Sequence, residues 1–157
     1  MATLYASNIN EIVDLIASVG KKRTVMVEGD MGIGKSSILK LLAKRFPEHQ
    51  PSYFDCTTKD LGDLYIPDLD TERGCVTFLP NEQFGIHLDK PLLLMIDEFG
   101  KANPSVKNGM LVTALERMIG NKKMHPDSIQ FMTTNLGAEG VGDLLPPHAR
   151  NRIVVVR

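Results

Sequence analysis

The residues most clearly arranged for chemistry lie between Gly29 and Ser36, where the chain reads Gly-Asp-Met-Gly-Ile-Gly-Lys-Ser. This order matches the phosphate-binding P-loop, or Walker A, pattern G-x-x-x-x-G-K-[ST]. Gly29 and Gly34 permit backbone angles that a Cβ would forbid, so consecutive N–H groups can turn toward phosphate oxygens. Lys35 brings a positive charge to the outer phosphates, and the Ser36 hydroxyl can bind Mg²⁺. The motif therefore predicts a site for a nucleotide and its metal ion.

The flanks of this motif have the elements that a P-loop requires. Residues 24–28 form a β-type run before the first glycine, and apolar residues recur at helical spacing from Ile38 to Phe46, just before Pro47. The start of that helix points the positive end of its dipole at the phosphates. The nucleotide-binding residues that we predict are Gly29, Asp30, Met31, Gly32, Ile33, Gly34, Lys35, Ser36 and Ser37.

A second candidate for chemistry is the pair of carboxylates Asp97 and Glu98, which follows the apolar run 92–96. A strand that is apolar at every position is typical of a parallel sheet buried on both faces. Such a strand ending in Asp-Glu, downstream of a P-loop, is a Walker B pattern. We expect Asp97 to hold Mg²⁺ through its water shell and Glu98 to take a proton from the attacking water. The alternative is a strand that only happens to end in an acidic turn.

Asn135 ends a further core strand, residues 128–135. Ligands of open α/β sheets bind outside the carboxyl ends of the strands, so Gly29, Asp97 and Asn135 should converge on one crevice. Asn135 could position the γ-phosphate or the attacking water. An Asn favoured only for a turn is the alternative interpretation.

These elements predict an α/β fold with a central five-stranded parallel sheet flanked by helices. The strands are expected at residues 24–28, 52–56, 92–98, 128–135 and 153–156, and the long helices at 8–20, 36–46 and 103–120. Asn8 and Asn103 are predicted N-caps, the latter followed by Pro104. Residues 57–89 form an irregular insertion with a hairpin around Gly74, a length that is uncommon without a function. This insertion could be a surface that meets a substrate.

Composition limits the class of protein. The chain has 157 residues, of which 43% are hydrophobic and 24% charged, as expected for a single domain over residues 1–157. A net charge of −1 provides no general attraction to nucleic acid or membrane. The two cysteines and four histidines show no metal-ligand spacing, and the longest apolar stretch, 91–96, is too short to cross a bilayer. We therefore predict a cytoplasmic protein with reduced thiols.

Over nearly its whole length the chain resembles the AAA+ ATPases, and among them the MoxR-like and dynein-related (midasin-type) group. The resemblance rests on the P-loop, on Asp-Glu-Phe at 97–99 followed by Lys-Ala-Asn-Pro at 101–104, on Thr-Thr-Asn at 133–135, and on Leu-Pro at 145–146 before Asn-Arg-Ile at 151–153. It implies that Asn135 is the residue called sensor 1. It also implies an arginine finger that reaches a neighbouring subunit's nucleotide, with Arg152 the first choice and Arg150 the second.

The resemblance further implies ATP or ADP with Mg²⁺ as ligands, self-association through nucleotide into a hexameric ring, and remodelling of an unidentified protein complex. Members of the family carry a helical lid after the last strand, and nothing in this sequence follows Arg157. We expect the lid to be absent here, which favours a fragment over a chain that works without a lid. The base should pack near the first helix, although no residue there is specific enough to assign.

Two other functions remain open at this stage. The chain could be a nucleotide-binding assembly or switch module with negligible turnover, or a P-loop kinase that phosphorylates a small molecule. A kinase usually has arginines in a lid before the end of its sheet, whereas the final segment here has arginines only at 150, 152 and 157. The absence of an N-K-x-D motif argues against a GTPase.

Overall fold

The computed structural model describes residues 3–6, 8–30, 32, 34–135 and 145–157. Its centre is a parallel sheet with the strand order β1-β10-β2-β9-β6-β3. The strands are β1 (Thr3–Leu4), β2 (Thr24–Gly29), β3 (Gln50–Asp55), β6 (Leu92–Asp97), β9 (Ile129–Asn135) and β10 (Ile153–Val156). The five predicted strands are confirmed. The sixth, β1, was not predicted because two residues at a sheet edge have no periodicity to recognise.

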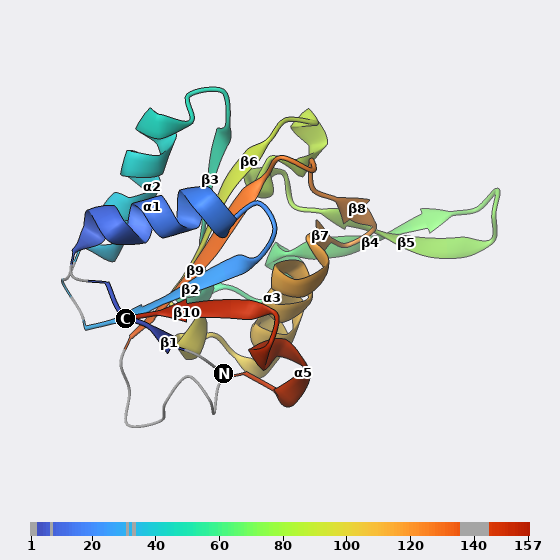
Figure 1. Cartoon of the computed structure of the whole chain (residues 1–157). Helices are drawn as coiled ribbons and strands as arrows, with labels where there is room; N and C mark the ends of the chain where they lie inside the picture. Colours follow the sequence, from blue (N-terminus) through green and yellow to red (C-terminus); the bar gives the residue numbers. More distant parts are fainter. Residues whose placement is uncertain (1–2, 7, 31, 33, 136–144) are drawn as a thin grey trace.

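Helices cover both faces of this sheet (Figure 1). On one face lie α1 (Ile9–Val19) and α2 (Lys35–Arg45), and on the other α3 (Pro104–Glu116) and the short α5 (Pro147–Arg150). Successive strand residues point to opposite faces. In β6, Leu93 packs with the α1 and α2 side, whereas Leu94 packs with the α3 side, and both are fully buried. This double burial explains why the run is apolar at every position.

The predicted helix caps agree with the structure. The Asn8 side chain accepts hydrogen bonds from the backbone N–H groups of Asn10 and Glu11, and the Asn103 side chain accepts one from Val106. The predicted end of α3 at Gly120 is wrong. The helix ends at Glu116, and Arg117 adopts a left-handed conformation with φ 56°.

Gly120 instead forms the turn of a two-stranded hairpin, β7 (Met118–Ile119) and β8 (Lys122–Lys123). A Cβ on Gly120 would lie 2.4 Å from the carbonyl oxygen of Phe78, and Asn121 N–H donates to the same oxygen (2.9 Å). The apolar spacing that suggested a longer helix continues into this hairpin. There the contacts with Phe78, which is distant in sequence, favour the hairpin over a continued helix.

The insertion contains the predicted hairpin, built from antiparallel β4 (Tyr65–Asp70) and β5 (Cys75–Pro80). Gly74 has φ 67° in its turn, and the hairpin extends away from the rest of the molecule (Figure 1). Short 3₁₀ turns connect it to the sheet: η1 (Cys56–Thr58) and η2 (Leu61–Asp63) before it, and η3 (Glu82–Phe84) and η4 (Ile86–Leu88) after it. A further 3₁₀ turn, η5 (Phe99–Lys101), follows β6.

Cys56 is buried and Cys75 is exposed, and neither forms a disulfide. Burial, together with the carboxylate of neighbouring Asp55, raises the pKa of the Cys56 thiol to about 12. None of the helices in the described part of the chain is long and apolar enough to cross a membrane.

Candidate functional site

The strand ends of β2, β6 and β9 lie together at the carboxyl edge of the sheet. Gly29 at the end of β2 is paired with Asn135 at the end of β9, and Asp97 at the end of β6 is paired with Asp55 of β3. The P-loop leaves this edge after Gly29 and leads into α2. Within it Gly32 has φ 82° and Gly34 has φ 90°, angles that explain why these positions are glycine.

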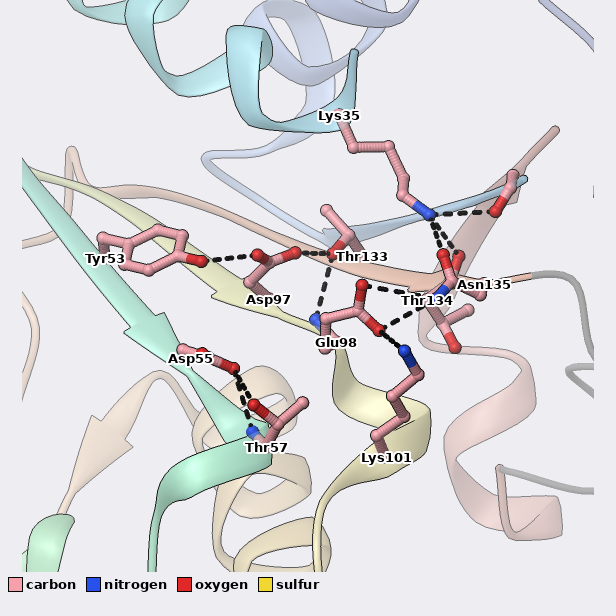
Figure 2. A network of polar contacts seen from close by, with 11 residues as sticks. Lys35, Tyr53, Asp55, Thr57, Asp97, Glu98, Lys101, Thr133, Thr134 and Asn135 are labelled. Carbon is pink, nitrogen blue, oxygen red and sulfur yellow. Dashed lines mark hydrogen bonds and ion pairs between the residues drawn. The ribbon is translucent and has the colours of Figure 1, made fainter. Parts of the chain in front are cut away.

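Lys35, the first residue of α2, is buried and turned back onto the sheet (Figure 2). Its Nζ donates to the carbonyl oxygens of Gly29 (2.9 Å) and Thr134 (3.3 Å) and to the side-chain oxygen of Asn135 (2.5 Å). Burial lowers the pKa of the Lys35 ammonium, and the nearby carboxylates of Glu98 and Asp97 oppose that shift. A phosphate here would meet a lysine that is already positioned.

Glu98 comes directly after β6 in a left-handed backbone conformation, with φ 56° and ψ 41°. Such a conformation costs an L-residue about 1–2 kcal/mol, and it places the Glu98 carboxylate beside the end of β9. Nδ2 of Asn135 donates to both Glu98 oxygens (3.0 and 3.3 Å), and Nζ of Lys101 lies 3.3 Å from one of them. Glu98 is thus connected through Asn135 to Lys35 (Figure 2).

The Asp97 carboxylate accepts one hydrogen bond on each oxygen. The Thr133 hydroxyl of β9 donates to Oδ1, and the Tyr53 hydroxyl of β3 donates to Oδ2 (2.6 Å). Thr133 also accepts a hydrogen bond from the backbone N–H of Glu98 (3.1 Å). Although about half of Tyr53 is exposed, partial burial of its hydroxyl and then the hydrogen bond to Asp97 raise the pKa of the phenol.

The structure brings together the predicted site residues Gly29, Lys35, Asp97, Glu98 and Asn135. Ser36 and Ser37 lie in the exposed first turn of α2, and Asp30 is exposed next to Gly29. Met31 and Ile33 lie outside the described residues.

Arg150 and Arg152 lie outside this network. Nε of Arg150, in α5, donates to the carbonyl oxygen of Leu145 (3.0 Å). Arg152 is held against the C-terminal end of α3, where it donates to the Leu115 carbonyl (2.8 Å) and pairs with Glu116 (3.2 Å). It precedes β10, which begins opposite the first residue of β2, at the other end of that strand from Gly29.

Sequence reasoning missed Tyr53, Thr133 and Lys101 as members of the site. Strand alternation could have indicated Tyr53, because it lies two positions before Asp55, at the end of the same strand, and shares a sheet face with it. Lys101 is three residues after Glu98, a spacing at which side chains on a helical turn meet. The pairing of Thr133 with Asp97 depends on which strand lies beside β6, and local sequence does not specify that.

A cavity of about 200 Å³ lies beside the P-loop lysine. Ile9, Ile12 and Ile38 give it an apolar lining, and the side chains of Lys35 and Arg157 add positive charge. Arg157 also pairs with the buried carboxylate of Glu28 (2.5 Å). The cavity is therefore a small, largely apolar space whose lining also includes Lys35 and the ion-paired Arg157.

The oxygen donors present suit magnesium. Asp97 offers a carboxylate and Ser36 a hydroxyl, both of which are hard ligands of the kind that Mg²⁺ prefers. The described residues contain no cluster of three or more His, Cys, Asp or Glu side chains that could hold a metal ion alone. Magnesium sites often have one or two protein ligands, with substrate phosphates and waters completing the shell, so the donor set fits that kind of site.

No protein-family model matches the chain, and no curated protein does. Among solved structures it is similar to the 2.00 Å crystal structure of a proposed ATPase from Cytophaga hutchinsonii, with a TM-score of 0.57 and 15% identity. The match covers 94% of this chain and 46% of that protein, so this chain spans about half its length. At this identity the likeness shows the fold. The chain has the α/β fold of a P-loop NTPase core.

Proposed function

We propose that the chain is the nucleotide-binding subdomain of a magnesium-dependent AAA+ ATPase. The observation that carries this proposal is the continuous connection Lys35–Asn135–Glu98, which joins a P-loop lysine to the acidic residue that follows β6. In P-loop NTPases the lysine neutralises the outer phosphates, and a polar residue orients the attacking water. Here Asn135 of β9 is within hydrogen-bond distance of both Lys35 of α2 and Glu98, which follows β6.

In the proposed complex the P-loop backbone, residues 29–34, wraps the phosphates, and Lys35 exchanges its bond with Asn135 for the γ-phosphate. The base enters the apolar cavity beside α1, between Ile9, Ile12 and Ile38. This cavity supports the expectation that the base packs near the first helix. Its apolar lining would recognise the ring mainly by shape.

Hydrolysis requires a water in line with the γ-phosphate. Glu98 would accept one proton from that water as its oxygen bonds to phosphorus and the bond to the ADP oxygen breaks. Asn135, released from Lys35, would orient the water while its amide group keeps Glu98 in place. Magnesium, when bound, would neutralise charge on the β- and γ-phosphates, and Ser36 and Asp97 are the residues that would hold it.

A second subunit would complete the site. Arg152 remains our first choice for the finger, with Arg150 the alternative, because the Arg152 side chain is about half exposed and its pair with Glu116 lies on the surface. Releasing Arg152 toward a neighbouring nucleotide would break this exposed pair, which contributes about 0–1 kcal/mol, and its hydrogen bond to the Leu115 carbonyl. In related hydrolases a finger supplied in trans raises the rate by about 10³-fold or more.

By the sequence resemblance, the assembly would be a MoxR-like, dynein-related ring, with a hexamer as the expected size, that remodels another protein complex in the cytoplasm.

One feature supports a second candidate, a nucleotide-dependent switch with negligible turnover. Glu98 is engaged by both Asn135 and Lys101, so the proposed base is held in an existing pair.

The test combines sedimentation with phosphate release for the wild type and Glu98→Gln, with and without ATP–Mg²⁺, at several protein concentrations. The proposal expects assembly with nucleotide, turnover that rises steeply with concentration, and a loss of about 10²–10⁴-fold in Glu98→Gln, with nucleotide binding retained. Tight binding with flat, negligible turnover at every concentration would favour the switch. Absence of nucleotide binding would reject both.

A further inference from the structure

The Asp97 carboxylate is fixed from two sides by hydroxyl groups of neighbouring strands. Thr133 of β9 donates to Oδ1 and Tyr53 of β3 donates to Oδ2 (2.6 Å), as Figure 2 shows. Since β6 lies between β3 and β9, the two donors reach Asp97 from opposite sides. Two hydroxyl donors restrict rotation of a carboxylate and fix the direction of its remaining lone pairs.

The register explains how Tyr53 reaches this position. Tyr53 is paired with Met95 across the β3–β6 ladder, and Asp97 comes two residues later on the same face of β6. A phenol is long enough to cover this diagonal, whereas a shorter hydroxyl side chain at position 53 would not reach it. Because about half of Tyr53 is exposed, packing in the core does not account for its presence.

We propose that Tyr53 is a positioning residue for the magnesium site, holding Asp97 so that its free lone pairs face the metal's water shell. This inference rests on the proposed function, since it assigns Asp97 to magnesium. An ionised carboxylate has about four lone-pair positions, so the two hydroxyl donors leave two for the hydrated ion. Groups that orient a metal ligand in this way are worth about 10–100-fold in metal affinity.

The Tyr53 hydroxyl could instead weaken metal binding, and its removal would then change the metal affinity in the opposite direction. If the Tyr53 hydroxyl mainly occupied an oxygen that the hydrated metal needs, then its removal would strengthen metal binding. The sign of the change in metal affinity therefore distinguishes a positioning role from a blocking one.

The experiment compares Tyr53→Phe with the control Tyr65→Phe, which also removes a tyrosine hydroxyl. Tyr65 lies in β4, outside the site, and packs edge-on against Phe78. Binding of a fluorescent ADP analogue is titrated in EDTA and across a range of Mg²⁺ concentrations. Mn²⁺ is then titrated by electron paramagnetic resonance in the presence of saturating ADP. Thermal unfolding verifies that each variant is folded, and Thr133→Val serves as a second removal of a donor to Asp97.

We expect Tyr53→Phe to raise the half-saturating Mg²⁺ and Mn²⁺ concentrations about 10-fold. Affinity for ADP in EDTA should stay unchanged, and Tyr65→Phe should match the wild type. Metal affinity that is unchanged or tighter in Tyr53→Phe overturns the inference, as does an equal loss of ADP binding without metal. A wild type that binds ADP but shows no response to metal removes this inference and the magnesium dependence of the proposed function, while nucleotide binding stands. A wild type that binds no nucleotide removes the proposed function as a whole.

Discussion

The carboxyl edge of the sheet and the β4–β5 hairpin are ordered in different ways. At the carboxyl edge, side chains from several elements hold one another: Lys35 from α2, Asn135 from β9 and Glu98 after β6. In the hairpin, two strands pair mainly with each other and extend away from the body (Figure 1). Leu69 on this hairpin is three-quarters exposed. The positions of side chains at the carboxyl edge therefore depend on the whole fold, whereas the conformation of the hairpin depends mainly on the pairing of its own two strands.

The base of the hairpin is the exception. There Phe78 meets the turn of the β7–β8 hairpin, through its contact with Gly120 and the hydrogen bond from Asn121. Tyr65 packs edge-on against Phe78 (ring centroids 5.4 Å apart). Changes in the outer hairpin should therefore leave the site undisturbed, and changes at its base should alter stability rather than nucleotide binding.

The largest expected effect is at the carboxyl edge itself. Lys35→Ala should weaken nucleotide binding by about 100-fold, because hydrogen bonds to charged groups contribute about 1.5–3 kcal/mol each and Lys35 provides the positive charge at the P-loop. Isothermal titration with an ATP analogue measures this loss. Lys40→Ala, on an exposed position of the same helix, is the matched control and should bind like the wild type. Equal affinities of the two variants would contradict the assignment of the site.

The next effect compares the same Leu-to-Ala substitution in the core of the sheet and in the hairpin. Leu94→Ala in β6 removes a fully buried side chain and should lower the free energy of unfolding by about 2–5 kcal/mol. Leu69→Ala in β4 removes a side chain that is 75% exposed and should change it by at most about 0.5 kcal/mol. Urea denaturation followed by circular dichroism measures both. A large loss of unfolding free energy in Leu69→Ala would show that the outer hairpin is packed in solution, which would contradict its description as locally ordered.

The smallest effects on the free energy of unfolding are expected for three glycines. Gly62 and Gly74 lie in the insertion, and Gly120 contacts it. Gly120→Ala combines φ 60° with a clash against Phe78 and should cost about 2–3 kcal/mol. Gly74→Ala meets no atom within 4 Å but keeps φ 67°, so about 1 kcal/mol is expected. Gly62→Ala has neither problem and should stay within about 0.5 kcal/mol of the wild type.

Thermal unfolding should reproduce this order of the three glycine variants. All three variants should bind nucleotide normally, because none touches the carboxyl edge. Weaker nucleotide binding in Gly120→Ala would show that the hairpin base and the site are coupled.

Much of the fold followed from local patterns. The alternation of apolar runs with helical periods predicted the five main strands, and the Asn caps predicted the starts of α1 and α3. The end of α3 was not predicted correctly, because apolar spacing continues past Glu116 and the left-handed Arg117 ends the helix. Arg117 donates to the backbone carbonyls of Gly20 and Ser128 at the amino end of the sheet, and Gly20 is far from it in sequence.

Residue types and their spacing were enough to predict the chemical parts of the site: a P-loop with its lysine, two carboxylates after a buried strand, and an Asn at the end of another. These depend on residue type and spacing over a few positions, which a linear chain specifies directly. The contacts of Tyr53 and Thr133 with Asp97, and of Asn135 with both Lys35 and Glu98, could be found only in the folded structure. Those contacts depend on the strand order, in which β3 and β9 lie on either side of β6. Strand order is set by the packing of helices on both faces, and no short stretch of sequence contains it.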